Sequence, residues 1–166
     1  MALRYASIAG DEQAVRSHTG LTEQEFKILA ASFGQEWAHY IEYFTWEGKE
    51  RIRQSKVRKN SVLASIEDKL LFILFFLKTN PLQQVLATTF GLNQPQASRW
   101  LELLQARLLA VLAKEKLLPE RKADRLYRVV VGESKVIIDA TERPVGRSVD
   151  DETQKEQYSG KKKPYD

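Results

Sequence analysis

The sequence predicts a mainly α-helical protein with a short α/β segment toward its C-terminal end. Three observations support this prediction. Apolar residues recur at helical spacing as far as about Leu112, helix-capping residues precede these segments, and β-branched runs of strand length follow Pro119. We expect an N-terminal helical region at 1–60, a second helical domain at 61–118 and the start of an α/β domain at 119–166.

The first helix is expected after Thr22, because Glu25 lies three residues further on and completes a capping box. Residues before Thr22 are weakly patterned. Apolar and aromatic residues from Phe26 to Phe44 follow at helical spacing. Such a stripe usually forms a core face, although three aromatic residues in and just after it could instead stack on bases: Trp37, Tyr40 and Trp46.

The next helix is expected over 66–78, with Ser65 as its N-cap and acids in its first turn. It is apolar almost all round, so neighbouring elements must enclose it. Asn80 and Pro81 then predict a new helix, with Asn80 as the cap and Pro81 at the first helical position.

Residues 82–100 show the most specific folding pattern of the chain. A short helix over 82–90, a tight turn over 91–93 and a second helix from Gln94 predict a helix-turn-helix. Ala87 is small where the second helix crosses, and Gly91 can adopt the positive φ of a sharp turn. The junction would be filled by Leu86, Phe90, Leu92, Ala97, Trp100 and Leu101. An ordinary αα-hairpin is the alternative.

In a helix-turn-helix the second helix lies in the major groove of double-stranded DNA, with its N-terminal residues at the base edges. The exposed residues there are expected to be Gln94, Gln96, Ser98 and Arg99. Gln pairs with adenine and Arg with guanine through two hydrogen bonds, while Ser can hold a phosphate. The helix is expected to continue to about Lys116, with an apolar seam at Ala97, Leu101, Leu104, Leu108 and Leu112. That seam either packs on the first helical region or mediates self-association.

Composition and charge narrow the function classes. The chain has no Cys and two His residues, which excludes a cysteine zinc site and makes a His-based one improbable. The apolar run 70–77 is too short to span a membrane, and no signal peptide is apparent, so we expect a cytoplasmic protein without membrane contact. The net charge is +4, and basic residues crowd into 49–59. Lys56, Arg58 and Lys59 are expected to neutralise phosphates, although a solvated linker would look the same.

The C-terminal segment contains Asp139-Ala-Thr-Glu-Arg-Pro144, after a β-branched run, and later Tyr158-Ser-Gly-Lys-Lys-Lys163. These residues resemble the start of the catalytic domain of insertion-sequence transposases of the Asp-Asp-Glu type, which has an RNase-H-like α/β fold. The resemblance implies that Asp139 is the first catalytic carboxylate and a metal ligand. An Asp after an apolar strand can also simply start a turn. The sequence departs from the family at Pro164, where a strand would continue.

In that family the second Asp and the Glu lie further along than Asp166, so we expect the N-terminal part of a split or truncated transposase. It would recognise element ends through the helix-turn-helix, be inactive alone and need no cofactor, whereas a completed transposase would use Mg²⁺. Two alternatives stay open: a component completed by frameshifting or by a second polypeptide, and an unrelated helix-turn-helix transcriptional regulator. A homo-oligomer or a second transposase polypeptide is the expected protein partner.

Overall fold

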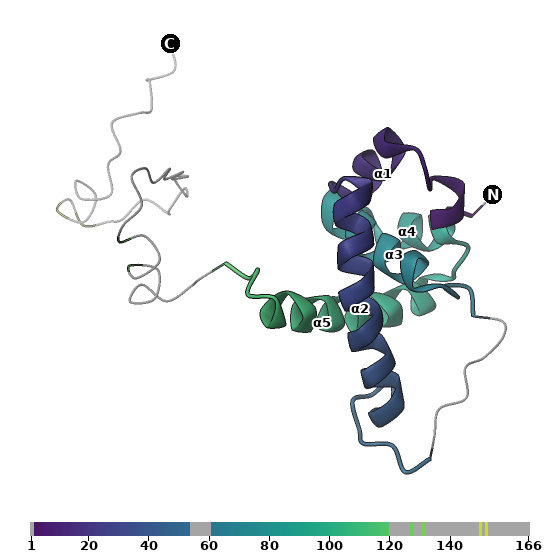
Figure 1. Cartoon of the computed structure of the whole chain (residues 1–166), viewed down its shortest axis with the longest axis vertical. Coiled ribbons are helices and arrows are strands. Elements are labelled where there is room, and N and C mark those ends of the chain that lie inside the picture. Colours follow the sequence, from purple (N-terminus) through teal and green to yellow (C-terminus); the bar gives the residue numbers. More distant parts are fainter. Residues whose placement is uncertain are drawn as a thin grey trace. The chain divides into compact units, whose positions relative to one another are not determined.

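The computed structural model describes residues 2–53 and 61–119, together with Tyr127, Val131, Asp150 and Glu152. The chain divides into two compact units, Met1–Pro119 and Glu120–Asp166. The described part of the first unit is helical: a 3-10 helix at Tyr5–Ser7 and the α-helices α1 to α5 (Figure 1). The predicted mainly α-helical class is confirmed for these residues, in which no strand occurs beyond an isolated bridge between Phe44 and Glu50.

Helix α1 spans Glu12–Thr19 and was not predicted, because its few apolar residues give a weak pattern. Its boundaries are nevertheless clear. The carboxylate of Asp11 accepts a hydrogen bond from the amide of Ala14 at 3.0 Å, and Gly20 ends the helix at φ 84°. Val15 is completely buried. The expectation that the first helix begins after Thr22 is therefore wrong, since one buried face suffices to hold this short helix.

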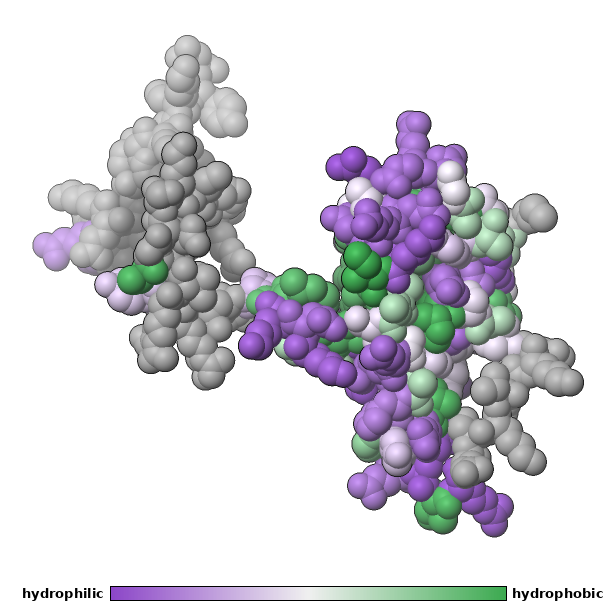
Figure 2. All heavy atoms as spheres, viewed as in Figure 1, coloured by the Kyte–Doolittle hydropathy of each residue, from purple (hydrophilic) through white to green (hydrophobic). Residues whose placement is uncertain are grey.

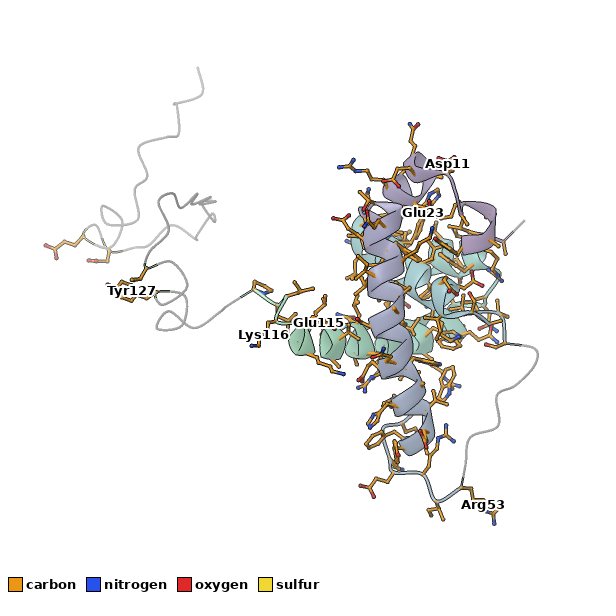
Figure 3. The ribbon with its side chains drawn as sticks, in the orientation of Figure 1. Asp11, Glu23, Arg53, Glu115, Lys116 and Tyr127 are labelled. Carbon is orange, nitrogen blue, oxygen red and sulfur yellow. The ribbon has the colours of Figure 1, made fainter. Side chains whose placement is uncertain are left out.

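Helix α2 spans Glu23–Tyr43 and begins with the predicted capping box. The Thr22 hydroxyl accepts from the Glu25 amide at 3.2 Å, and the Glu25 carboxylate accepts from the Thr22 amide at 2.8 Å. The aromatic stripe forms core as expected, with Phe26, Phe33 and Tyr40 buried. In Figure 3, Asp11 and Glu23 lie close together, far from Arg53, which follows the other end of α2.

Helix α3 spans Ile66–Thr79 with Ser65 as its N-cap, as predicted. Residues 70–73 are completely buried, and α1, α2 and α5 all pack against this helix. The expectation that its neighbours enclose it is confirmed for residues 68–74, whereas Leu77 near its C-terminal end is 51% exposed. In Figure 2 hydrophilic side chains cover much of the visible surface of the unit that contains α3.

The prediction that Asn80 and Pro81 start the next helix is wrong. Asn80 instead ends α3 in the left-handed conformation, at φ 42°, and its amide donates to the Phe76 carbonyl at 2.8 Å. Asn is one of the few residues besides Gly that tolerate this conformation, so it serves as a C-cap here. Helix α4 spans Gln83–Phe90, after Leu82 as its N-cap.

Helix α5 spans Gln94–Lys114 and packs against α2, α3 and α4 (Figure 1). Part of its predicted seam is buried, namely Ala97, Leu104 and Leu108. Leu101 and Leu112 are half-buried against the core, whereas Trp100, Leu103 and Val111 are buried as well. Packing on the N-terminal helices thus accounts for this seam. None of the helices in the described part of the chain is long and apolar enough to cross a membrane.

Most of the predicted α/β segment lies outside the described residues, including Asp139. Val131 is an exception, and it lies in a turn in which its amide donates to the Tyr127 carbonyl at 2.9 Å. The β-branched runs after Pro119 predicted strands, and one of them includes Val131, so this prediction is wrong at Val131. β-Branched composition alone is a weak predictor, because strand formation depends on the neighbouring strands.

Candidate nucleic-acid interface

Helices α4 and α5 are joined by a three-residue turn at the predicted position. Gly91 ends α4 at φ 67°, and its amide donates to carbonyls of the last turn of that helix. The amide of Leu92 donates to the Ala87 carbonyl at 2.8 Å. Asn93 then caps α5. The predicted helix-turn-helix geometry is thus present.

Small and apolar side chains let the two helices approach each other. Ala87 of α4 and Ala97 of α5 are completely buried, and so are Leu86 and Phe90. Phe90 packs edge-on against Phe72 of α3, with 5.0 Å between the ring centroids. The α4–α5 pair is therefore fixed to the core of the unit, so its exposed face is held in one orientation.

The N-terminal segment Ala2–Tyr5 holds the end of α4. The amide of Leu3 donates to the Thr89 carbonyl at 2.8 Å, and the Arg4 guanidinium donates to the Phe90 carbonyl at 3.0 Å. Thr89 and Phe90 are the last two residues of α4, where the helix supplies no amide of its own for these carbonyls. The Tyr5 amide donates to the Asp68 carboxylate at 2.8 Å, which ties the segment to α3 as well. Nothing in the local sequence indicated this role.

The start of α5 is fixed by a reciprocal capping box. The Asn93 side chain accepts from the Gln96 amide at 2.9 Å, and the Gln96 carboxamide oxygen accepts from the Asn93 amide at 3.1 Å. Both residues satisfy amide groups that a helix start leaves without partners. The first turn of α5 is therefore ordered by its own side chains.

The structure leaves most of the predicted reading residues accessible. Gln94, Gln96 and Arg99 are exposed, and Ser98 is half-buried. The Gln96 oxygen, however, faces the helix start in the capping box. Gln94 and Arg99 thus have carboxamide and guanidinium groups available for base edges in the first two turns of the helix.

A cluster of aromatic rings supports α5 from the α2 side. The Trp100 ring stacks on Trp37 at 5.8 Å and packs edge-on against Trp46 at 4.5 Å. The exposed fraction of Trp46 is 46%, whereas Trp100 is buried. Two turns further on, Arg107 forms an ion pair with Glu36 at 3.1 Å, and its guanidinium lies 4.0 Å from the centroid of the Tyr40 ring. These contacts hold α5 against α2.

The basic segment is described only in part. Lys49 pairs with Glu47 at 3.4 Å, and the Arg51 guanidinium donates to the Phe44 carbonyl at 2.6 Å. The predicted phosphate contacts Lys56, Arg58 and Lys59 lie outside the described residues, as does Asp139. Among the residues that are described, no three His, Asp or Glu side chains form a group that could hold a metal ion.

Residues 61–115, which span α3, α4 and α5, match the family model for the helix-turn-helix of DDE superfamily endonucleases. This match supports the predicted helix-turn-helix of a transposase and indicates DNA binding for this segment. It ends before the segment that resembles a catalytic domain. No curated protein and no solved structure matches the chain.

Proposed function

We propose that this chain recognises the ends of an insertion sequence through α4 and α5, as the DNA-binding part of a transposase. The observation that supports this proposal is the exposure of Gln94 and Arg99 in the first two turns of α5, within a segment that matches a transposase helix-turn-helix. Gln and Arg are the side chains that best distinguish adenine and guanine in the major groove.

In this proposal, affinity and specificity come from different parts of the chain. Between residues 80 and 106 the only basic residue is Arg99, so the helix-turn-helix itself offers few phosphate contacts. The basic segment with Lys56, Arg58 and Lys59 would supply sequence-independent affinity by neutralising phosphates. Base contacts from α5 would supply the preference for one sequence.

Binding to element ends tests the proposal directly. The full chain is titrated with a duplex that contains the terminal repeat flanking its own gene and with a scrambled duplex of the same composition. We expect tighter binding of the terminal repeat over a range of salt concentrations. Equal affinity for the two duplexes would reject end recognition and leave the transcriptional regulator as the alternative.

A catalytic role is the second candidate, and it is supported by the resemblance at Asp139. Asp139 would supply one carboxylate to a Mg²⁺ site of a completed transposase, in which further carboxylates must contribute because Mg²⁺ requires several fixed oxygen ligands. Strand cleavage of the terminal-repeat duplex with Mg²⁺, lost in Asp139→Asn, would establish this role.

A further inference from the structure

The first residues of the two helices of the helix-turn-helix contact each other through their side chains. Gln83 begins α4, Gln94 begins α5, and the Gln94 carboxamide nitrogen donates to the Gln83 carboxamide oxygen at 3.4 Å. The turn brings together two residues that are 11 positions apart. Gln83 is half-buried, whereas Gln94 is exposed. The more buried side chain thus restrains the more accessible one.

This contact leaves Gln94 with a specific set of free hydrogen-bonding groups. A carboxamide has two N–H donors and one oxygen acceptor. One N–H is used by Gln83, so one N–H and the oxygen remain. Adenine presents one acceptor, N7, and one donor, the N6 amino group, in the major groove, and a carboxamide pairs with both. When Gln83 accepts the N–H that points away from the Gln94 oxygen, Gln94 keeps the donor and the acceptor that adenine requires.

Gln96 is in a different situation. Its oxygen accepts from the Asn93 amide at 3.1 Å, inside the capping box of α5. Pairing with both groups of adenine would require Gln96 to turn away from the helix start and leave that amide without its partner. Of the two glutamines predicted to read bases, Gln94 is the one whose carboxamide is free to do so.

We propose that Gln83 is a positioning residue that holds the Gln94 carboxamide for adenine, and that the recognised site has an A·T pair opposite Gln94. This inference rests on the proposed reading of DNA by α5. Restraining a long side chain before binding lowers the entropy that its ordering costs at the interface, so the Gln83 contact should add to discrimination. Gln83 itself need not touch a base.

The experiment starts from the full chain and a library of random-sequence duplexes, from which the preferred duplex is selected. The base pair that Gln94 reads is identified as the position of the selected duplex at which the Gln94→Ala variant no longer prefers one base pair over the others. At that position we expect the wild-type chain to favour A·T over G·C roughly 5- to 150-fold, the range of one good base pairing. Gln83→Ala should reduce this ratio roughly 2- to 10-fold, as expected for one lost hydrogen bond.

Two further variants separate positioning from a general effect on the fold. Gln84→Ala is the matched control, because Gln84 is an exposed neighbour on α4 whose side chain makes no hydrogen bond in the described part of the chain. It should leave the ratio unchanged. Gln83→Glu keeps an acceptor for the Gln94 nitrogen, so it should retain the preference for A·T even though its negative charge weakens binding to every duplex. In the Gln83→Ala background, Gln94→Ala should reduce the ratio of A·T to G·C affinity by a smaller factor than it does in the wild-type chain.

The outcomes distinguish this inference from the proposed function. If the wild-type chain enriches no sequence, both fail. If Gln94→Ala removes an A·T preference and Gln83→Ala leaves it intact, positioning by Gln83 is wrong while recognition by α5 stands. A preference for another base pair at the Gln94 position, or an enriched sequence that Gln94→Ala does not relax, also overturns the inference. If Gln83→Ala melts at a clearly lower temperature, its effect on binding could reflect the fold, and Gln83→Glu is used in its place. Loss of the A·T preference in Gln83→Glu would contradict positioning by Gln83.

Discussion

The ammonium group of Lys69, a buried residue of α3, lies 5.3 Å from the ring centroid of Trp37. It donates to the carbonyls of Ala64 and Ser65 at 2.9 and 3.0 Å and lies 6.0 Å from the Trp100 ring. Burial lowers the pKa of Lys69 to about 8. The two carbonyls and the indole faces thus stabilise a cation that is otherwise cut off from water.

The lowered pKa of Lys69 predicts a rise in stability at alkaline pH. An unfolded Lys titrates near pH 10.4, so between about pH 8 and 10 the unfolded chain binds more protons than the folded chain, and the free energy of unfolding increases with pH. The increase is at most about 3 kcal/mol. Below pH 8 both states are protonated and this contribution is constant. Burial also raises the pKa of Tyr5, which opposes the increase above about pH 10.

Urea denaturation at several pH values, compared with Lys69→Met, measures this effect. Met keeps an unbranched side chain of similar length but cannot titrate, so the difference between the two proteins isolates Lys69 from the other Lys and Tyr residues. We expect the free energy of unfolding to rise relative to the variant from pH 8 to 10. Parallel pH profiles for the two proteins would show that the Lys69 ammonium is solvated.

The burial of Trp100 predicts a large loss of stability on truncation. Trp100→Ala removes the ring that packs on Trp37 and Trp46, and the expected cost is about 3–5 kcal/mol. Leu109→Ala is the matched control on the same helix, because Leu109 is 48% exposed and its replacement should cost much less. Chemical denaturation followed by circular dichroism compares them. Equal transition midpoints for the two variants would contradict the position of Trp100.

Two glycines should respond to alanine with opposite signs. Gly91 has φ 67°, and a Cβ there would lie 3.1 Å from the Ala2 Cβ, so Gly91→Ala should cost about 1–2 kcal/mol. Gly34 lies inside α2, and a Cβ there would meet Ile66 at an ordinary 3.5 Å, so Gly34→Ala should stabilise by roughly 0.5–1 kcal/mol. Melting temperatures of the two variants provide the measurement. Stabilisation by Gly91→Ala would show that the turn does not need its left-handed conformation.

The helix boundaries that could be predicted from the sequence depend on neighbouring residues. The caps at Thr22 and Ser65 lie within three residues of the groups they bind, so the sequence shows both partners. Asn80 was misassigned because Asn is favoured both at the N-cap of a helix and in the left-handed C-cap conformation. Local sequence alone does not decide which helix such a residue serves.

The exposed and buried residues of the candidate site could also be predicted, because they follow from the local pattern of a helix. Helical phase correctly made Gln94 and Arg99 exposed and Trp100 buried, although their contacts with DNA stay predictions. The capping role of Gln96 follows from its spacing from Asn93, which is that of a capping box. The bond from Arg4 to Phe90 joins residues that are 86 positions apart, so only the tertiary structure reveals it.

The last prediction separates base reading from phosphate binding. Arg99→Ala should cost about 1–3 kcal/mol at the preferred duplex and relax the preference at one position, because a guanidinium that pairs with guanine is lost. Lys56→Ala or Arg58→Ala should instead weaken binding to all sequences and reduce the salt slope by about 1 each. Asp139→Asn is the control, because the family resemblance gives Asp139 a role in catalysis and not in DNA binding. This variant should bind DNA like the wild-type chain. Filter-binding titrations at several salt concentrations compare the four variants. Unchanged specific affinity of Arg99→Ala would exclude Arg99 from base reading. Because the Arg99 side chain is exposed, its removal should not unfold the domain, so a change in affinity would report on the contact with DNA.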